Sequence, residues 1–214
     1  MNALALFEED SKTNLTKLDL VLDRFLNNLP HKPYCADNFE WGGGLKIRSK
    51  SIAITKPYIQ FNHPNWKKYI ILDIDNPGAV SDWIFEKSHL PAPNLVIENK
   101  KNGRAHFVFE LIDAVSFTAK SSLKAQNYYT AVSKSLTEHF DADQRYTGLI
   151  CKNPFSSQWR ISSFKEEPYH LKELADKLEL YDQNLSADQN IINNNYRIIW
   201  DCGNYVFTKN YKYN

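Results

Sequence analysis

The hydrophobic and polar residues of this chain follow two periods that alternate along the sequence. Helical spacing of apolar residues covers 13–29, where Pro30 ends the run, and it recurs over 79–89, 117–140 and 168–180. Runs rich in β-branched and aromatic residues predict strands at 69–74, 94–99, 105–112, 147–155 and 159–163. Helices that alternate with strands predict a mixed α/β fold built in layers.

The turn between two of these strands predicts how they pair. Asn102-Gly103 lies between the strand patterns 94–99 and 105–112, and an Asn-Gly pair in this place is typical of a β-hairpin. We therefore expect a hairpin beside the strand 69–74, in a largely antiparallel sheet flanked by helices. The segment 31–65 is rich in proline, glycine and aromatic residues and is expected to be irregular.

Composition narrows the class of protein. The chain has 214 residues, of which 43% are hydrophobic and 24% charged, so it can bury a sizeable core. Its formal net charge of +1 excludes a strong overall attraction to nucleic acid or membrane, and any such surface must be local. No apolar run approaches the roughly 20 residues that span a bilayer. The sequence therefore predicts a cytoplasmic protein with no membrane partner.

The cysteines give no sign of a disulfide framework or a zinc site. Cys35, Cys151 and Cys202 are odd in number and widely spaced.

Two aspartates end the strand 69–74. Asp73 and Asp75 are two residues apart, so their side chains leave one face of the strand together. The repulsion between two close carboxylates is offset by solvent, by hydrogen-bond donors or by a cation, and Mg²⁺ or Mn²⁺ prefers such oxygen ligands. The spacing by itself favours a metal site and a solvated acidic turn equally.

The sequence before the aspartates is basic and aromatic. Between Trp41 and Leu72 there are six basic residues and no acidic ones. Cations that neutralise phosphates, together with rings on which bases stack, suit a groove for a single strand of nucleic acid. The candidates for contact with a template are Lys46, Arg48 and Lys67. A solvated basic face over core aromatics remains the commoner reading of such a stretch.

A basic pair stands at the start of the strand 105–112. Arg104 and His106 share a face by the same spacing, so both are placed to donate hydrogen bonds to a triphosphate beside the acidic strand. A lone histidine on a strand is more often a packed or surface residue.

Five short motifs in a fixed order resemble a known family. They are ILDID at 71–75, LPAPN at 90–94, NGRAH at 102–106, AD at 142–143 and TGLICKNP at 147–154. Together they resemble the plasmid replicase family over about 24–180. Its members are replication initiator primases of small colicin-type theta plasmids, in the archaeo-eukaryotic primase and primase-polymerase superfamily. The resemblance implies a primase-polymerase catalytic fold with an RRM-like palm.

The resemblance also implies roles for residues. Asp73, Asp75 and Asp143 would bind two divalent metals, Mg²⁺ or Mn²⁺, with Asp141 as the competing choice for the third carboxylate. His106 would contact the phosphates of the incoming nucleotide, with Arg104 beside it.

Other charged residues match the family less closely. Lys152 stands where relatives often carry a phosphate-facing cation, and Arg160 is a weaker candidate that is equally plausible at the edge of the core. The remaining carboxylates are read as surface or loop charges: Asp82, Glu98, Glu110 and Asp113.

The function implied is that of a plasmid replication initiator primase, a nucleotidyltransferase that makes a short primer on single-stranded DNA by two-metal phosphoryl transfer. Its partners would be single-stranded template or plasmid origin DNA, nucleoside triphosphates and a host DNA polymerase. The alternatives are a DNA-binding replication-initiator fragment with little or no polymerase activity, and a metal-dependent nuclease.

The expected organisation is a catalytic domain over 1–168 and a C-terminal helix and extension over 169–214, the start of a truncated or absent C-terminal module. The family usually continues into a helical module and an origin-reading domain. The chain is therefore expected to be either an excised catalytic domain or a naturally short protein, and origin binding is in doubt.

Overall fold

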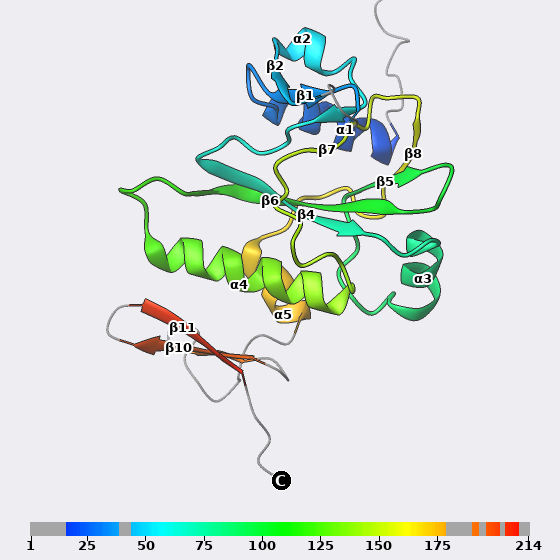
Figure 1. The fold of residues 1–214 in the computed structure, drawn as a ribbon. Helices are drawn as coiled ribbons and strands as arrows, with labels where there is room; N and C mark the ends of the chain where they lie inside the picture. The colour runs from blue at the N-terminus through cyan, green and yellow to red at the C-terminus, as the bar shows by residue number, and fades with distance from the viewer. Residues whose placement is uncertain (1–15, 39–43, 179–189, 193–195, 202–203, 210–214) are drawn as a thin grey trace, which may run out of the picture.

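A four-stranded antiparallel sheet lies at the centre of the molecule and separates two layers (Figure 1). The computed structural model describes residues 16–38, 44–178, 190–192, 196–201 and 204–209. The order of the strands in the central sheet is β4-β6-β5-β8. Their bounds are Trp66–Ile74 for β4, Ala105–Ser116 for β6, Leu95–Asn99 for β5 and Trp159–Ser162 for β8.

The predicted hairpin is confirmed, and it lies beside the acidic strand. Strand β5 pairs with β6, and β6 pairs along its other side with β4. In this register Asp73 of β4 and Ile97 of β5 are both direct neighbours of His106. The two middle strands therefore bring the acidic motif and the histidine motif to adjacent positions.

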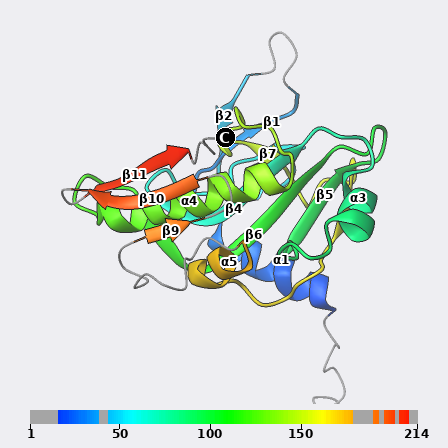
Figure 2. The same cartoon turned by 90° about the horizontal axis from the view of Figure 1, so that it is seen from below.

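Three helices cover one face of the central sheet. They are α3 (Ala79–Glu86), α4 (Leu123–His139) and α5 (Leu171–Lys177), which lie below the sheet in Figure 1 and in front of it in Figure 2. Alternate side chains of β4 and β6 point to these helices, as the period of two requires. The core on this face includes Leu72, Phe107, Phe109, Val132 and Leu136.

The opposite face carries a helix and a second small sheet. Helix α1 (Lys17–Asn28) packs there beside a four-stranded antiparallel sheet of order β2-β1-β3-β7. The bounds are Lys46–Ile47 for β2, Tyr34–Ala36 for β1, Tyr58–Ile59 for β3 and Cys151–Lys152 for β7, with the short helix α2 at Lys50–Ala53. Phe25, Ile59, Phe61, Ile97 and Val108 form the core of this layer.

Side-chain caps set where two helices begin. The hydroxyl of Thr16 accepts from the backbone N–H of Asp19, and the Asp19 carboxylate accepts from that of Thr16, so α1 starts in a capping box. The helix predicted from residue 117 starts at Leu123 instead, because the Ser122 hydroxyl caps it by accepting from the Ala125 N–H.

One prediction on the small sheet needs correction. The segment 31–65 was expected to be irregular, but it holds β1, β2, β3 and α2. These strands are two or three residues long, too short for an alternating pattern. The two short strands predicted at 147–155 and 159–163 are confirmed as β7 and β8, which belong to different sheets.

The C-terminal strands form a third sheet of their own. Strands β9 (Asn190–Ile192), β10 (Tyr196–Asp201) and β11 (Asn204–Lys209) pair in the order β11-β10-β9. This sheet lies on the outer side of α4 in both views (Figures 1 and 2). None of the helices in the described ranges is long and apolar enough to cross a membrane.

Candidate active site

The candidate site lies on the face of the central sheet that meets the small sheet. Asp73 stands near the end of β4, with its side chain 24% exposed. Its Oδ1 lies 3.1 Å from Nε2 of His106 and 3.7 Å from Nζ of Lys152. The carboxylate therefore has a partner on the neighbouring strand β6 and another on β7.

His106 is held on both ring nitrogens. Nε2 faces Asp73, and Nδ1 is 3.2 Å from the backbone N–H of Lys152, which donates to it. Nδ1 must then be the unprotonated nitrogen, so Nε2 carries the proton and donates to Asp73. Burial lowers the pKa of His106, and this outweighs the opposing effect of the Asp73 carboxylate. A neutral imidazole thus orients Asp73.

The electrostatics keep Asp73 ionised. Burial by itself would raise the pKa of Asp73, but the hydrogen bond from His106 and the charge of Lys152 together hold it below its ordinary value. Burial lowers the pKa of Lys152, and the Asp73 carboxylate opposes this. The pair is a largely buried ion pair in which each charge offsets the burial of the other.

Asp75 lies just beyond the end of β4 and has a different partner. Its Oδ1 is 3.2 Å from a terminal nitrogen of Arg104, and both side chains are at least half exposed. The hairpin turn packs closely here: a Cβ added to Gly103 would stand 2.8 Å from the backbone nitrogen of Gly78. Glycine at 103 thus lets the turn that carries Arg104 approach the turn that follows Asp75.

Asp143 is joined to the acidic strand through the backbone. Its N–H donates to the carbonyl oxygen of Asp73 over 2.9 Å, and its Oδ1 accepts from the N–H of Arg145 over 2.9 Å. Asp141 has a left-handed backbone (φ 53°), and its carboxylate forms an ion pair with Lys87, the residue that follows α3. Of the two candidates for the third carboxylate, Asp143 is the one placed beside Asp73.

The donor set is of the kind that binds hard divalent cations. Asp73, Asp75 and Asp143 offer carboxylate oxygens, and cationic side chains already stand against each of them: Lys152, Arg104 and Arg145. Within the described residues, no three His, Cys, Asp or Glu side chains converge in a group that could hold a metal. The three carboxylates thus fit a divalent metal by their chemistry, but in the described residues their side chains do not converge on one point.

The other predicted contact residues do not gather at one place. Lys46 and Arg48 lie at β2, the outer strand of the small sheet, and both are exposed. Lys67 lies near the start of β4, with its Nζ 5.9 Å from the ring centre of Phe117. Arg160 on β8 forms an ion pair of 3.2 Å with Glu98, which makes it an edge arginine of the sheet. Part of the basic stretch, at 41–43, lies outside the described residues.

Glu110 corrects the interpretation of the remaining acids as surface charges. It is 2% exposed, and its carboxylate accepts from Nε of Arg24 over 3.0 Å and from Asn28 over 3.3 Å. This group ties α1 to β6. The alternation of β6 puts position 110 on the same face as His106, but the partner is 86 residues away in sequence.

Tyr146 was not singled out by the sequence, although it touches the site. Its ring centre is 5.2 Å from that of His106, and its hydroxyl lies 2.8 Å from the carbonyl oxygen of Ile150 and 3.0 Å from Sγ of Cys151. Only its position three residues after Asp143 could have pointed to it. Cys35 and Cys151 are free and buried thiols, and Cys202 lies outside the described residues.

A comparison with solved structures identifies the class of fold. The chain matches the AEP domain of the primase-polymerase (PrimPol) of cyanophage S-2L with a TM-score of 0.52 and 13% sequence identity, over 75% of this chain and 97% of that one. The central sheet with its two layers is thus the fold of an archaeo-eukaryotic primase-polymerase domain. Residues 28–178 match the profile of the Replicase family. The chain belongs to the Replicase family. None of the curated proteins matches it significantly.

Proposed function

We propose that this protein is a replication initiator primase of plasmid type, which joins nucleotides into a short primer on single-stranded DNA. The observation that carries the proposal is that three acidic residues meet cationic or imidazole side chains at the ends of β4, β6 and β7 and in the loops beside them. Asp73 contacts His106 and Lys152, Asp75 contacts Arg104, and the backbone of Asp143 is bonded to that of Asp73. The Replicase family and the AEP fold support this reading.

The acidic residues have the role of metal ligands in the proposal. Mg²⁺ or Mn²⁺ held by Asp73, Asp75 and Asp143 would supply the charge that activates the attacking hydroxyl and steadies the leaving pyrophosphate. His106 fixes the orientation of one Asp73 oxygen and leaves the other oxygen of that carboxylate for a ligand. We infer that this positioning is the first task of His106, with phosphate contact following from its place beside the carboxylates.

The cationic residues have the role of triphosphate ligands. Arg104 is half exposed and presents a fork of donors that fits phosphate oxygens. Lys152 is 8% exposed and stands at the floor of the site, where a charge acts in a medium poor in water. Both side chains stabilise negative charge that grows on the leaving phosphates during transfer.

The proposal is tested by primer synthesis on single-stranded DNA with labelled nucleoside triphosphates and Mg²⁺ or Mn²⁺. The wild type is expected to form oligomers and release pyrophosphate. Asp73→Asn is expected to lower the rate about a hundredfold or more, because an amide keeps the bond from His106 but is a poor metal ligand. Asp113→Asn, which changes an exposed carboxylate at the far end of β6, is the matched control and should retain full activity.

The alternatives predict other results. A DNA-binding initiator fragment would bind the template without incorporating nucleotides, and Asp73→Asn would leave its binding unchanged. A nuclease would shorten the DNA without releasing pyrophosphate from triphosphates. Equal product from the wild type and Asp73→Asn would remove the catalytic assignment of the acidic strand.

The partners and compartment are part of the same proposal. The residues described so far support nucleoside triphosphates and single-stranded DNA as substrates. We infer a cytoplasmic site of action and handover of the primer to a host DNA polymerase from the family alone.

A further inference from the structure

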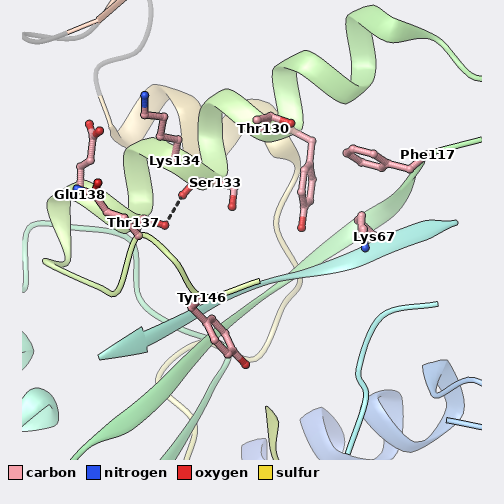
Figure 3. A pocket seen from close by; sticks show the side chains of 10 residues that line it. Lys67, Phe117, Thr130, Ser133, Lys134, Thr137, Glu138 and Tyr146 are labelled. Atoms are coloured by element: carbon pink, nitrogen blue, oxygen red, sulfur yellow. Dashed lines mark hydrogen bonds between the residues drawn. The ribbon is translucent and has the colours of Figure 1, made fainter. Parts of the chain in front are cut away.

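A cavity of about 330 Å³ opens between the edge strand β4 and helix α4 (Figure 3). Lys67 and Phe117 stand at one end, Tyr146 lies along the floor, and Ser133, Thr137 and Glu138 project from α4. Its volume is within the range of sites for small organic ligands. Nothing in the proposed chemistry of nucleotide transfer uses this space.

Lys67 is the feature that points to an anionic ligand. Its side chain is half-buried, and burial lowers its pKa, so the ammonium has lost part of its hydration. Within the described ranges it forms no ion pair, and its Nζ lies 5.9 Å from the ring centre of Phe117. A partly desolvated cation that lacks a carboxylate partner favours binding of an anion.

The rings of the cavity suit a flat partner. Phe117 and Tyr129 pack edge to face, with ring centres 5.5 Å apart, and the Tyr129 hydroxyl is anchored on the carbonyl oxygen of Tyr69 over 2.9 Å. Rings fixed in this way lose little freedom when a base stacks on them. The ammonium of Lys67 suits the phosphate of a nucleotide, and the aromatic rings next to it suit the base.

The cavity adjoins the candidate active site through one residue. Tyr146 lines the cavity and also packs against His106, which is bonded to Asp73. The cavity and the acidic site are therefore neighbours along β4, with Lys67 and Asp73 at opposite ends of the strand.

We propose that the cavity binds one unpaired nucleotide of the single-stranded DNA on which the protein acts, with Lys67 on the phosphate and Phe117 against the base. The inference rests on the proposed function, because it names where the same substrate is held. The proposal separates Lys67 from the other two candidates for template contact: Lys46 lies on β2 of the small sheet, and Arg48 directly follows that strand.

The test is the binding of a fluorescently labelled oligothymidylate, measured by anisotropy with EDTA present so that no transfer occurs. Lys67→Gln is expected to weaken binding about fivefold near 0.1 M salt and to reduce the salt slope by about 0.7. Phe117→Leu is expected to weaken binding about fivefold or more by removing the stacking surface.

The chain offers a matched control for each variant. Lys68→Gln removes the next cation along β4, whose Nζ donates instead to the carbonyl oxygen of Ile112 over 2.7 Å. Phe85→Leu removes a ring that is 84% exposed on α3. Both controls should bind DNA as the wild type does, and melting curves check that all four variants are folded. Equal affinities of Lys67→Gln and Lys68→Gln, or of the two phenylalanine variants, would overturn the cavity proposal.

Photo-crosslinking separates the two sources of a nucleotide. An oligonucleotide with 5-iodouracil should label a peptide that contains Phe117, Tyr129 or Tyr146, whereas free 5-iodo-UTP should not. Labelling by the free nucleotide alone would overturn the assignment to a DNA strand. Primer synthesis is measured separately. If the cavity binds no DNA but primers are made, only the cavity proposal is wrong. If the cavity binds DNA but no primers are made, only the catalytic proposal is wrong.

Discussion

At the scale of single residues, two carboxylates of the central sheet, Asp73 and Glu110, are each paired with a cationic side chain. Asp73 and Glu110 both lie on the face of the central sheet that meets α1 and the small sheet, yet they behave differently. The pKa of Asp73 is held down by its partners, whereas burial raises the pKa of Glu110 and the Arg24 guanidinium opposes this only in part. The first carboxylate is kept charged, and the second is buried at some cost to the folded state.

The pKa of Glu110 predicts a dependence of stability on pH. The folded pKa lies above the ordinary 4.5, so the folded state binds more protons than the unfolded state between the two values. Glu110 therefore contributes most to the free energy of unfolding below its pKa in the unfolded state. This contribution is lost as the pH rises through its higher pKa in the folded state. Glu110→Gln cannot titrate and lacks this decrease.

The measurement is urea unfolding of the wild type and Glu110→Gln at steps from about pH 4 to pH 7. The free energy of unfolding of the wild type should fall relative to that of the variant across this range. A difference that stays constant or rises with pH would contradict the assignment. Asp113→Asn, at an exposed position, should show no such trend.

At the scale of elements, the hairpin of β5 and β6 connects the fold to the site. Its turn carries Gly103 at φ +70°, against Gly78 of the turn that follows β4. Gly148 has a similar φ of +66°, but a Cβ there would meet nothing within 4 Å. The two glycines therefore separate the effect of backbone conformation from that of close packing.

Gly103→Ala is expected to lower the free energy of unfolding by about 2–4 kcal/mol, because a left-handed alanine is strained and its Cβ clashes with the backbone. Gly148→Ala should lose only the conformational part, about 1–2 kcal/mol. Urea unfolding measures both values. Primer synthesis should also fall in Gly103→Ala, since the turn positions Arg104, and equal losses in the two variants would refute the packing argument.

The elements also show which parts of the fold could be predicted from the sequence. The hairpin, the acidic strand and the helices α3, α4 and α5 follow from period, turn residues and caps, which are local signals. The short strands β1 to β3 are formed by pairing across the sheet, and they are too short to show a local sequence pattern that would predict them. The ion pair of Glu110 with Arg24 and the backbone bond of Asp143 to Asp73 join distant parts of the chain. Spacing and the family resemblance could therefore suggest candidate site residues but not their partners.

At the scale of the whole molecule, the central sheet serves two cores at once. Phe109 of β6 is fully buried in the core under α4, and Ile97 of β5 is fully buried in the core under α1. Since β5 and β6 are paired strands of one sheet, neither core can be lost while the other keeps its sheet. We expect the two layers to unfold together.

Truncations in the two cores test this expectation. Phe109→Ala should lower the free energy of unfolding by about 3–5 kcal/mol and Ile97→Ala by about 2–5 kcal/mol. Ile84→Ala, at a side chain 42% exposed on α3, should change it by about 0.5 kcal/mol or less. Circular dichroism and tryptophan fluorescence should report one shared transition in every variant, and two separate transitions would show that the layers unfold independently.

The backbone bond from Asp143 to Asp73 has an effect outside chemistry. Strand β4 ends the central sheet, so its outward N–H and C=O groups would be free to recruit a strand from a second copy. At Tyr69 the backbone N–H donates to the side-chain oxygen of Asn62, and the carbonyl oxygen accepts from the Asn62 amide and the Tyr129 hydroxyl. At Asp73 the carbonyl oxygen accepts from the backbone N–H of Asp143. The contact that brings Asp143 next to Asp73 thus also covers part of the β4 edge against pairing with a strand of another molecule.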